Sequence, residues 1–350
     1  MKEVFNIGAL RVGENYPAII IAELSDGHMG SFEKAQQLVG AAKDAGADVV
    51  KFQMHFPERE MISGVKMWAG DLQDILKRVW FSPNNHERIM EYCASIGIEY
   101  LCTPFSFEAV DTLERMGVHS FKTGSGEICN LPFHRKLAKI SARTGKPVFI
   151  STGMCTMAEL EETIALYTEE GANFLLMNCT SEYPINDYVH LRLGLIPVLR
   201  EKFRVMVGQS DHSTEIYSSL AAIALGAKVI EKHFTLDRNG PFPDDGMCLD
   251  PRMMRELVDA VRKVEKAIEG NEKIVLPEEA EIRSWAFHSV VSDRNLKKGE
   301  LITLANVRPA RPGSGIPAKY LDETYFHELE NKRCKTDIPK DTVITWEDLE

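Results

Sequence analysis

The sequence predicts an α/β protein, namely a (β/α)8 (TIM) barrel followed by a small, mostly β C-terminal domain. Short apolar runs rich in Val and Ile alternate with amphipathic stretches, a pattern typical of parallel strands joined by helical crossovers. Eight such units in about 250 residues match the count of a closed barrel. The runs are Ala18–Glu23, Asp48–Gln53, Ile98–Thr103, His119–Gly124, Pro147–Ser151, Asn173–Asn178, Arg204–Ser210 and Lys228–His233. An open, doubly wound sheet is the alternative, because the boundaries of short runs are loose.

The segments between the runs predict the outer helices of the barrel, among them Phe32–Ala45, Pro83–Ile96, Ala158–Glu170 and Pro251–Ile268. Residues 2–16 precede the first run and predict a short hairpin that closes the lower end of the barrel. The catalytic barrel domain is therefore expected over residues 1–270.

The amino-acid composition of the chain changes after Ile268. Residues 271–281 predict a charged, helix-poor linker, and residues 282–350 predict short strands separated by turns. This last part contains a faint internal repeat, called the internal echo below. Leu296–Thr303 resembles Ile338–Thr345, and the four residues that follow each segment are also similar. A domain of this size is marginally stable unless it packs on something.

Composition excludes several classes of protein. The formal net charge of -11 argues against a general nucleic-acid binder and against a partner of anionic membranes. The 7 cysteines are an odd number and are spread without a CxxC pair, which fits reduced thiols rather than a disulfide framework. No apolar signal segment or membrane-length run is present in the sequence. We therefore expect a cytoplasmic protein.

Two lysines occupy strands that should be apolar. Period-two alternation places Lys51 and Gln53 on the inner face of the second strand, opposite Val50 and Phe52, and Lys122 lies in the fourth strand. Lysine is almost never buried unless it is paired. The counter-charge is either an anionic substrate, which we favour, or a carboxylate inside the barrel.

Hydroxyl groups follow neighbouring strands at the end of a barrel where active sites lie. Ser125 follows the fourth strand in a Gly-rich turn, Ser151 ends the fifth, and Ser210 ends the seventh. Such turns let backbone N–H groups approach a phosphate. Each is weak alone, because Ser-Thr-Gly also simply starts helices, but together they predict a phosphate site.

Two histidines end the last two strands, His212 after the seventh and His233 in the eighth. Adjacent strands lie about 4.8 Å apart, so two imidazoles at matching heights can share one metal ion. The open coordination positions would suit water and substrate oxygens. The alternative is a pair of hydrogen-bonded structural histidines.

Two carboxylates complete the candidate site. Glu23 ends the first strand in an apolar context, and Asp244 lies in the loop Gly240–Gly246 after the eighth. Either could act as an acid or base. For Glu23 the alternative is a salt bridge to Lys51 or Lys122, and for Asp244 it is a turn role.

Ordered motifs then resemble the sialic acid synthase family: IIAELSDGHMG, VVKFQ, LCTPFS, FKTGSGE, ISTGM, CTSEYP, GQSDHS and EKHFTLDRN. RPGSGIP at 311–317 resembles the antifreeze-like (SAF) domain that these enzymes carry, so that domain is expected over 282–350. Family members condense phosphoenolpyruvate with an N-acyl amino sugar, releasing phosphate and forming a nine-carbon 2-keto-3-deoxy acid.

The resemblance also implies roles for individual residues. Phosphoenolpyruvate would be held by Lys51, Lys122, Ser125, Ser151 and Ser210. The sugar would be held by Gln53, Tyr183, Asp244 and Arg311, and His212 and His233 would bind the metal. Glu23 and Asp244 would be the catalytic carboxylates. The resemblance further implies Mn²⁺, with Mg²⁺ or Co²⁺ as alternatives, and a homodimer in which one subunit's C-terminal domain caps its partner's site.

Two segments on the sugar side depart from the family pattern. Gly27-His28-Met29-Gly30 replaces the usual Asn-His-Asn-Gly, and Asp244-Asp245 replaces Asp-His. The acceptor could therefore be N-acetylmannosamine, a related N-acyl hexose, or a 2,4-diacetamido-trideoxy hexose of legionaminate or pseudaminate synthesis. Weaker alternatives are a catalytically weakened homologue, a barrel synthase acting on a sugar phosphate, and a non-catalytic glycan-binding protein.

Overall fold

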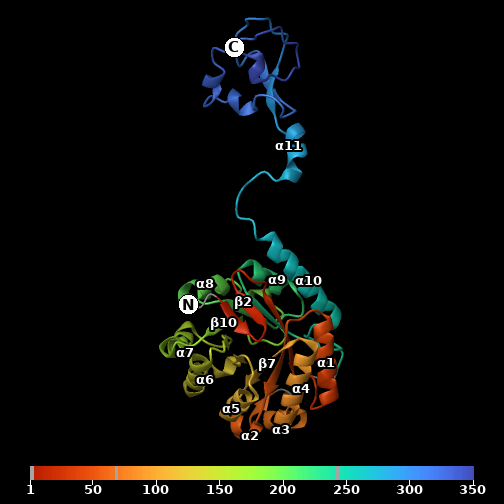
Figure 1. Cartoon of the computed structure of the whole chain (residues 1–350), viewed down its shortest axis with the longest axis vertical. Helices are drawn as coiled ribbons and strands as arrows, with labels where there is room; N and C mark the ends of the chain where they lie inside the picture. Colours follow the sequence, from red (N-terminus) through yellow and green to blue (C-terminus); the bar gives the residue numbers. More distant parts are fainter. Residues whose placement is uncertain (1–3, 68–69, 241–243) are drawn as a thin grey trace. The chain divides into compact units, whose positions relative to one another are not determined.

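A computed structural model describes residues 4–67, 70–240 and 244–350. The chain forms two compact units, Met1–Gly270 and Asn271–Glu350. The first unit is a parallel barrel surrounded by helices (Figure 1). Its strands are β3 (Ile19–Ser25), β4 (Val49–Met54), β7 (Glu99–Pro104), β8 (Phe121–Lys122), β9 (Val148–Ser151), β10 (Phe174–Cys179), β11 (Val207–Asp211) and β12 (Val229–His233).

The strands are hydrogen-bonded in the order β7-β4-β3-β12-β11-β10-β9-β8, and β7 packs beside β8, so the sheet closes on itself. Each of the eight predicted runs overlaps one strand, several of which extend one or two residues further, and the predicted barrel is confirmed. The helices of this unit are α1 (Phe32–Asp44), α2 (Pro57–Glu60), α3 (Leu72–Val79), α4 (Pro83–Ile96), α5 (Phe107–Met116), α6 (Leu131–Thr144), α7 (Met157–Glu170), α8 (Leu195–Phe203), α9 (Tyr217–Ala224) and α10 (Pro251–Ala267), with short 3-10 turns η1 (Ser125–Glu127) and η2 (Tyr188–Leu191).

Local sequence explains where the helices begin and end. Side chains of Ser82, Ser106 and Thr156 accept the backbone N–H three residues onward, and Thr156 forms a capping box with Glu159. Each such cap stabilises a helix start by about 1 kcal/mol. Several helices end on a glycine with positive φ, for example Gly97 at 71°, a conformation that residues with a Cβ adopt at a cost.

The alternation of side chains separates two apolar layers. Val50 and Phe52 belong to the core between strands and helices, whereas Val49 belongs to a smaller cluster inside the barrel. The predicted hairpin is present as β1 (Val4–Ile7) paired with β2 (Leu10–Gly13); residues 2 and 3 of that prediction lie outside the described residues. Phe5, Ile7 and Val12 join the interior cluster. The hairpin therefore fills one end of the barrel with apolar side chains.

The secondary structure of one segment in the barrel unit was not predicted. Between β4 and β7 the chain forms α2, a small hairpin of β5 (Lys66–Met67) and β6 (Gly70–Asp71), and α3 before reaching α4. Its elements are only two to eight residues long, too short for their periodicity to be recognised in the sequence.

The second unit has its own core. Its elements are η3 (Pro277–Glu279), α11 (Ala280–Ala286), β13 (Ser289–Ser292), β14 (Val307–Ala310), η4 (Ala318–Leu321), η5 (Phe326–Glu328) and η6 (Trp346–Asp348). The predicted helix-poor linker is wrong at its end, because η3 and the start of α11 fall within 277–281. The two echoing segments pair with each other: Leu296 and Ile338 exchange backbone hydrogen bonds of 2.8 and 2.9 Å. Both side chains lie in the unit's core.

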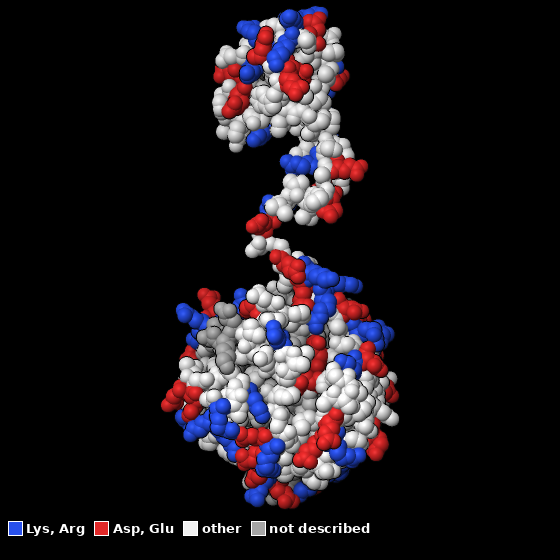
Figure 2. Space-filling model, viewed as in Figure 1, with Lys and Arg blue, Asp and Glu red and all other residues white. Residues whose placement is uncertain are grey.

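Charged side chains cover the surface without segregating by sign. On the face that Figure 2 shows, Lys and Arg of the described residues lie interspersed with Asp and Glu on both units. No helix among the described residues combines the length and the apolar composition that a membrane span needs.

Candidate active site

Charged side chains fill the open end of the barrel. Strand register places Glu23 directly beside Lys51 on one side and His233 on the other. Lys51 Nζ lies 2.7 Å from Glu23 Oε2 and 3.6 Å from Glu231 Oε1, and it donates a 3.0 Å hydrogen bond to Thr103. The inward orientation predicted for Lys51 is therefore present.

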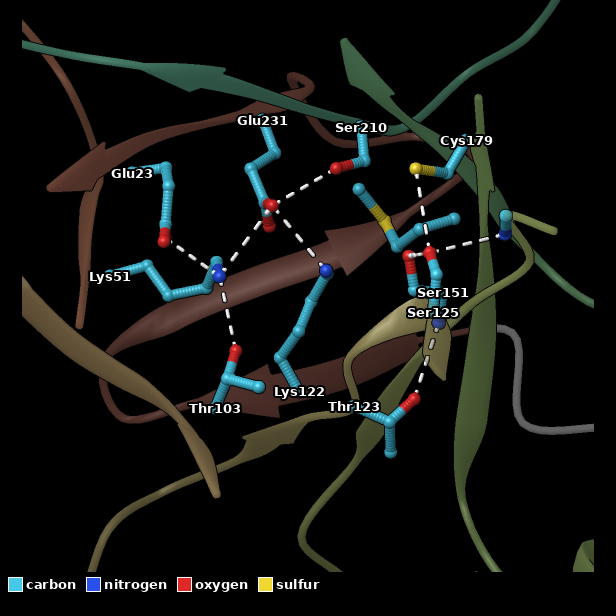
Figure 3. A network of polar contacts seen from close by, with 12 residues as sticks. Glu23, Lys51, Thr103, Lys122, Thr123, Ser125, Ser151, Cys179, Ser210 and Glu231 are labelled. Carbon is cyan, nitrogen blue, oxygen red and sulfur yellow. Dashed lines mark hydrogen bonds and ion pairs between the residues drawn. The ribbon is translucent and has the colours of Figure 1, made fainter. Parts of the chain in front are cut away.

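Glu231 is the centre of this cluster (Figure 3). Its Oε1 atom lies 3.4 Å from Lys122 Nζ and accepts a 3.0 Å hydrogen bond from Ser210 Oγ. A carboxylate inside the barrel thus lies beside both lysines. Sequence reasoning did not select Glu231, although the alternation that places His233 inward also places Glu231 inward.

The two carboxylates differ in electrostatic environment. Burial raises the pKa of Glu23; the charge of Lys51 opposes this, and that of Glu231 adds to it. The pKa of Glu231 is lowered, because the ammonium groups of Lys122 and Lys51 together outweigh the effect of burial. The surroundings therefore stabilise the ionised form of Glu231 more than that of Glu23.

Hydroxyl and backbone N–H donors, called the Ser125–Ser151 cradle below, lie on and just after the neighbouring strands. Ser125 Oγ and Ser151 Oγ are 2.9 Å apart, and the backbone N–H of Gly153 donates to Ser125 Oγ at 3.2 Å. A Cβ on Gly153 would approach Ser125 Oγ to 2.6 Å, so this turn requires glycine. Figure 3 shows the pair on the side of Lys122 away from Glu23. Hydroxyl and N–H donors next to an ammonium group are suited to a phosphate.

The two predicted metal-binding histidines lie side by side. Their ring centroids are 5.3 Å apart, and the ring of Tyr183 packs against His212 at 4.1 Å. Burial lowers the pKa of His212 to about 4 and that of His233 well below its ordinary value. Both rings are therefore neutral at pH 7, as metal ligation requires.

The donor set fits a divalent cation with open positions. His212 Nδ1 lies 2.7 Å from the carbonyl oxygen of Thr180, which orients the ring and leaves Nε2 for a ligand. His233 Nδ1 is buried without a hydrogen-bond partner, 4.0 Å from Asp244 Oδ2. In the described part of the chain, no three His, Cys, Asp or Glu residues gather as a metal cluster. The remaining ligands would therefore come from water and substrate.

The acidic residues of the last loop have distinct roles. Asp244 is partly buried, and burial together with the charges of Glu23 and Asp245 raises its pKa to about 6. Its carbonyl oxygen also accepts the N–H of Met247, so the turn role applies too. Asp245 accepts a 2.6 Å hydrogen bond from Thr235. Residues 241–243 of the predicted loop lie outside the described residues.

The other departure from the family pattern, residues 27–30, places His28 in the core. His28 is buried against Phe81, with ring centroids 4.4 Å apart, and burial lowers its pKa to about 3. Met29 is partly exposed with a φ of 51°. This segment therefore contributes backbone and packing to the rim of the site.

The structure brings most of the predicted residues together in the barrel unit: Glu23, Lys51, Gln53, Lys122, Ser125, Ser151, Tyr183, Ser210, His212, His233 and Asp244. Gln53 donates a 2.8 Å hydrogen bond to Glu23. Arg311 belongs to the second unit, where it follows β14 as an exposed side chain, and its role stays a prediction.

Comparisons with known proteins agree with this geometry. The NeuB family model matches residues 38–273, and the SAF domain model matches residues 287–350. An N,N'-diacetyllegionaminic acid synthase of Campylobacter jejuni is 35% identical, covering 91% of this chain and 97% of the relative. A pseudaminic acid synthase of the same species is 36% identical over 91% of this chain and 93% of the relative.

A solved structure of a sialic acid synthetase is also similar to this chain. The N-acetylneuraminic acid synthetase of Leptospira borgpetersenii, determined with citrate, is 28% identical with a TM-score of 0.72, covering 80% of this chain and 94% of the other.

Proposed function

The chain belongs to the NeuB family of sialic-acid-type synthases and carries a SAF domain, and on this premise we propose that it condenses phosphoenolpyruvate with an N-acyl amino sugar. The products are a nine-carbon 2-keto-3-deoxy acid and phosphate. The observation that carries the proposal is the pair of buried ammonium groups, Lys51 and Lys122, beside the Ser125–Ser151 cradle. One dianionic substrate would use both features.

The reaction forms one C–C bond and, from water, one C–O bond, and it breaks the C–O bond between carbon 2 and the phosphate. Carbon 3 of phosphoenolpyruvate attacks the aldehyde carbon of the open-chain sugar, and positive charge develops at carbon 2. Water adds to carbon 2, and the resulting intermediate expels phosphate. Lys51 and Lys122 would hold the carboxylate and phosphate and stabilise the negative charge of the leaving group.

Other residues would bind and orient the two substrates. The hydroxyl groups of Ser125, Ser151 and Ser210 would donate to phosphate and carboxylate oxygens. A divalent cation held by His212 and His233, with Mn²⁺ the first choice, supplies Lewis-acid polarisation of a carbonyl. Glu23 and Asp244, whose pKa values are both raised, would take up or release protons during the reaction.

The first acceptor to consider is N-acetylmannosamine or a related N-acyl hexose. A 2,4-diacetamido-trideoxy hexose is the second candidate, and it is favoured by the names of the legionaminic and pseudaminic acid synthases among the relatives. Residues 27–30 and 244–245 depart from the family pattern and border the side of the site where the family binds the sugar, so both kinds of acceptor belong in the test.

Phosphate release from phosphoenolpyruvate tests the proposal. The protein is incubated with Mn²⁺ and one aldose at a time: N-acetylmannosamine, its 6-phosphate, the 2,4-diacetamido-trideoxy hexoses, and arabinose 5-phosphate. Release that depends on one unphosphorylated N-acyl sugar and disappears in His212→Ala supports the proposal. Folded, metal-loaded protein that releases no phosphate with any of these sugars would contradict it.

A further inference from the structure

A second polar network lies on the β3–β4 side of the site, and its centre is a buried histidine that the proposed chemistry does not use. His55 follows β4, and its ring is stacked against Phe105 at 4.6 Å between centroids. One ring nitrogen, Nδ1, lies 2.9 Å from Glu60 Oε2, and the other, Nε2, lies 3.2 Å from Gln53 Oε1. The imidazole therefore connects α2 to a residue of the candidate sugar site.

The orientation of the Gln53 amide determines which atoms carry hydrogen. Its Nε2 donates to Glu23 Oε1 at 2.8 Å and to Ser25 Oγ at 3.2 Å. The reversed amide would place an oxygen against the Glu23 carboxylate, so that two acceptors faced each other. Since Gln53 Oε1 can only accept, Nε2 of His55 must be the donor.

The contact of His55 Nδ1 with Glu60, on the other side of the ring, indicates the same protonation state. Glu60 accepts the backbone N–H of Phe56 with its second oxygen, and its side chain is buried. A carboxylate in that setting receives a hydrogen from Nδ1 as well. With donors on both nitrogens, His55 is an imidazolium.

The surrounding charges agree with this assignment. Burial favours a neutral ring, but the hydrogen bond to Glu60 and the charges of Asp26, Glu60 and Glu23 raise the pKa of His55 overall. Asp26 Oδ2 lies 3.8 Å from Nε2, and Phe105 contributes no charge on the ring face. The ring thus remains cationic at a higher pH than an exposed histidine.

An irregularity in the backbone of β3 positions the two groups that accept hydrogen bonds from the Gln53 amide. The pairing of β3 with β4 shifts register between Glu23 and Ser25, and Ser25 has a φ of 46°. Bulges of this kind turn side chains toward active sites. Here the shift brings the Ser25 hydroxyl to the same amide nitrogen that contacts Glu23.

We propose that His55, clamped by Glu60, is a positioning residue that holds the Gln53 amide in the orientation whose N–H group binds Glu23. This rests on the proposed function. Glu23 Oε2 then faces Lys51 while Oε1 receives the Gln53 hydrogen bond, so the carboxylate presents one defined geometry to the substrate. Without the donor on His55, the amide can rotate and its oxygen would repel Glu23.

A spectroscopic measurement tests the clamp without any substrate. In ¹⁵N NMR of the histidine side chains, the His55 signals are identified by their disappearance in His55→Gln. We expect both ring nitrogens to be protonated, titrating at higher pH than exposed histidines, and Glu60→Gln to make the ring neutral at pH 7. A single neutral tautomer in the wild type at pH 6 would overturn the proposal.

Kinetics test the positioning role with the acceptor sugar that releases phosphate. We expect His55→Leu to lower kcat by about 10- to 100-fold, as loss of supporting hydrogen bonds does, with KM for phosphoenolpyruvate unchanged within about twofold. His55→Gln should recover part of the rate, because its amide can donate to Gln53. Glu60→Gln should also lower kcat.

The matched control is Glu58→Gln, on the same helix but with its side chain 78% exposed, which should leave the rate unchanged. Thermal unfolding establishes that each variant is folded. Equal loss in His55→Leu and His55→Gln, or a Glu60→Gln rate equal to that of Glu58→Gln, would overturn the proposal. An inactive wild type would instead contradict the proposed function, and the NMR result would then decide the state of His55 by itself.

Discussion

Glu231 Oε1 lies 3.4 Å from Lys122 Nζ inside the barrel, and the same atom is 3.6 Å from the ammonium group of Lys51. Lys51 is also 2.7 Å from Glu23 Oε2, so Glu231 shares the compensation of Lys51 and lies beside Lys122 as well. A substrate anion bound by the two lysines would compete with Glu231, and we expect this residue to limit how tightly phosphate groups are held.

Glu231→Gln should weaken the fold and strengthen anion binding. Removing one partner of a buried ion cluster costs on the order of 3 kcal/mol of unfolding free energy. Lys122 loses the carboxylate beside it and Lys51 keeps only Glu23, so the two lysines together should attract phosphate more strongly. Calorimetric titration with phosphoenolpyruvate and with inorganic phosphate measures the affinity, and urea unfolding measures stability. Glu161→Gln, which breaks an exposed ion pair with Lys202, is the control. Weaker anion binding in Glu231→Gln would contradict the expectation.

Divalent metal should stabilise the protein through the paired histidines. A ligand at 100 times its Kd adds about 2.7 kcal/mol to the unfolding free energy, so Mn²⁺ should raise the Tm of chelator-treated protein. His212→Ala and His233→Ala should lose that rise. His190→Ala, at an exposed ion pair with Glu182, should retain it. A rise that persists in both site variants would place the metal elsewhere.

Asp244 should make stability depend on pH in a defined direction. Its folded-state pKa of about 6 lies above the ordinary value for aspartate, so folding favours the protonated form. The resulting stability is complete below the ordinary pKa and is lost as pH rises through about 6. Asp244→Asn should therefore be the more stable protein at pH 8, by up to about 3 kcal/mol relative to its difference at pH 4. Parallel stability curves for the two proteins between pH 4 and pH 8 would exclude this.

The proposed homodimer predicts complementation between two inactive variants. If Arg311 reaches the active site of the partner subunit, a mixed dimer of His212→Ala and Arg311→Ala subunits contains one site with both residues intact. Co-expressed variants with different affinity tags, purified through both tags, should recover phosphate release that neither variant has alone. If Arg311 serves its own barrel, mixed dimers remain as inactive as the two parents.

Sequence patterns predicted the barrel and most of the candidate site for a physical reason. Strand alternation is strictly local, so Val50 and Phe52 facing the helices already placed Lys51 inward. The sequence offered Glu23, on the neighbouring strand, as one partner of Lys51. It did not indicate Glu231, which lies on β12 and approaches Lys51 only when β12 pairs with β3 and closes the barrel. His55 and Glu60 escaped notice for a related reason: their significance depends on a loop and a four-residue helix that carry no periodic signal.

The internal echo of the C-terminal unit has a consequence for how that unit folds. Leu296 and Ile338 hydrogen-bond to each other across a long separation in sequence, and each brings its own set of apolar neighbours to one shared core. Neither segment can bury those side chains until the other arrives, so the entropy of closing the intervening loop precedes the gain from burial. We therefore expect this unit to fold cooperatively, with the Leu296 and Ile338 amides exchanging hydrogen with solvent in a single common opening event.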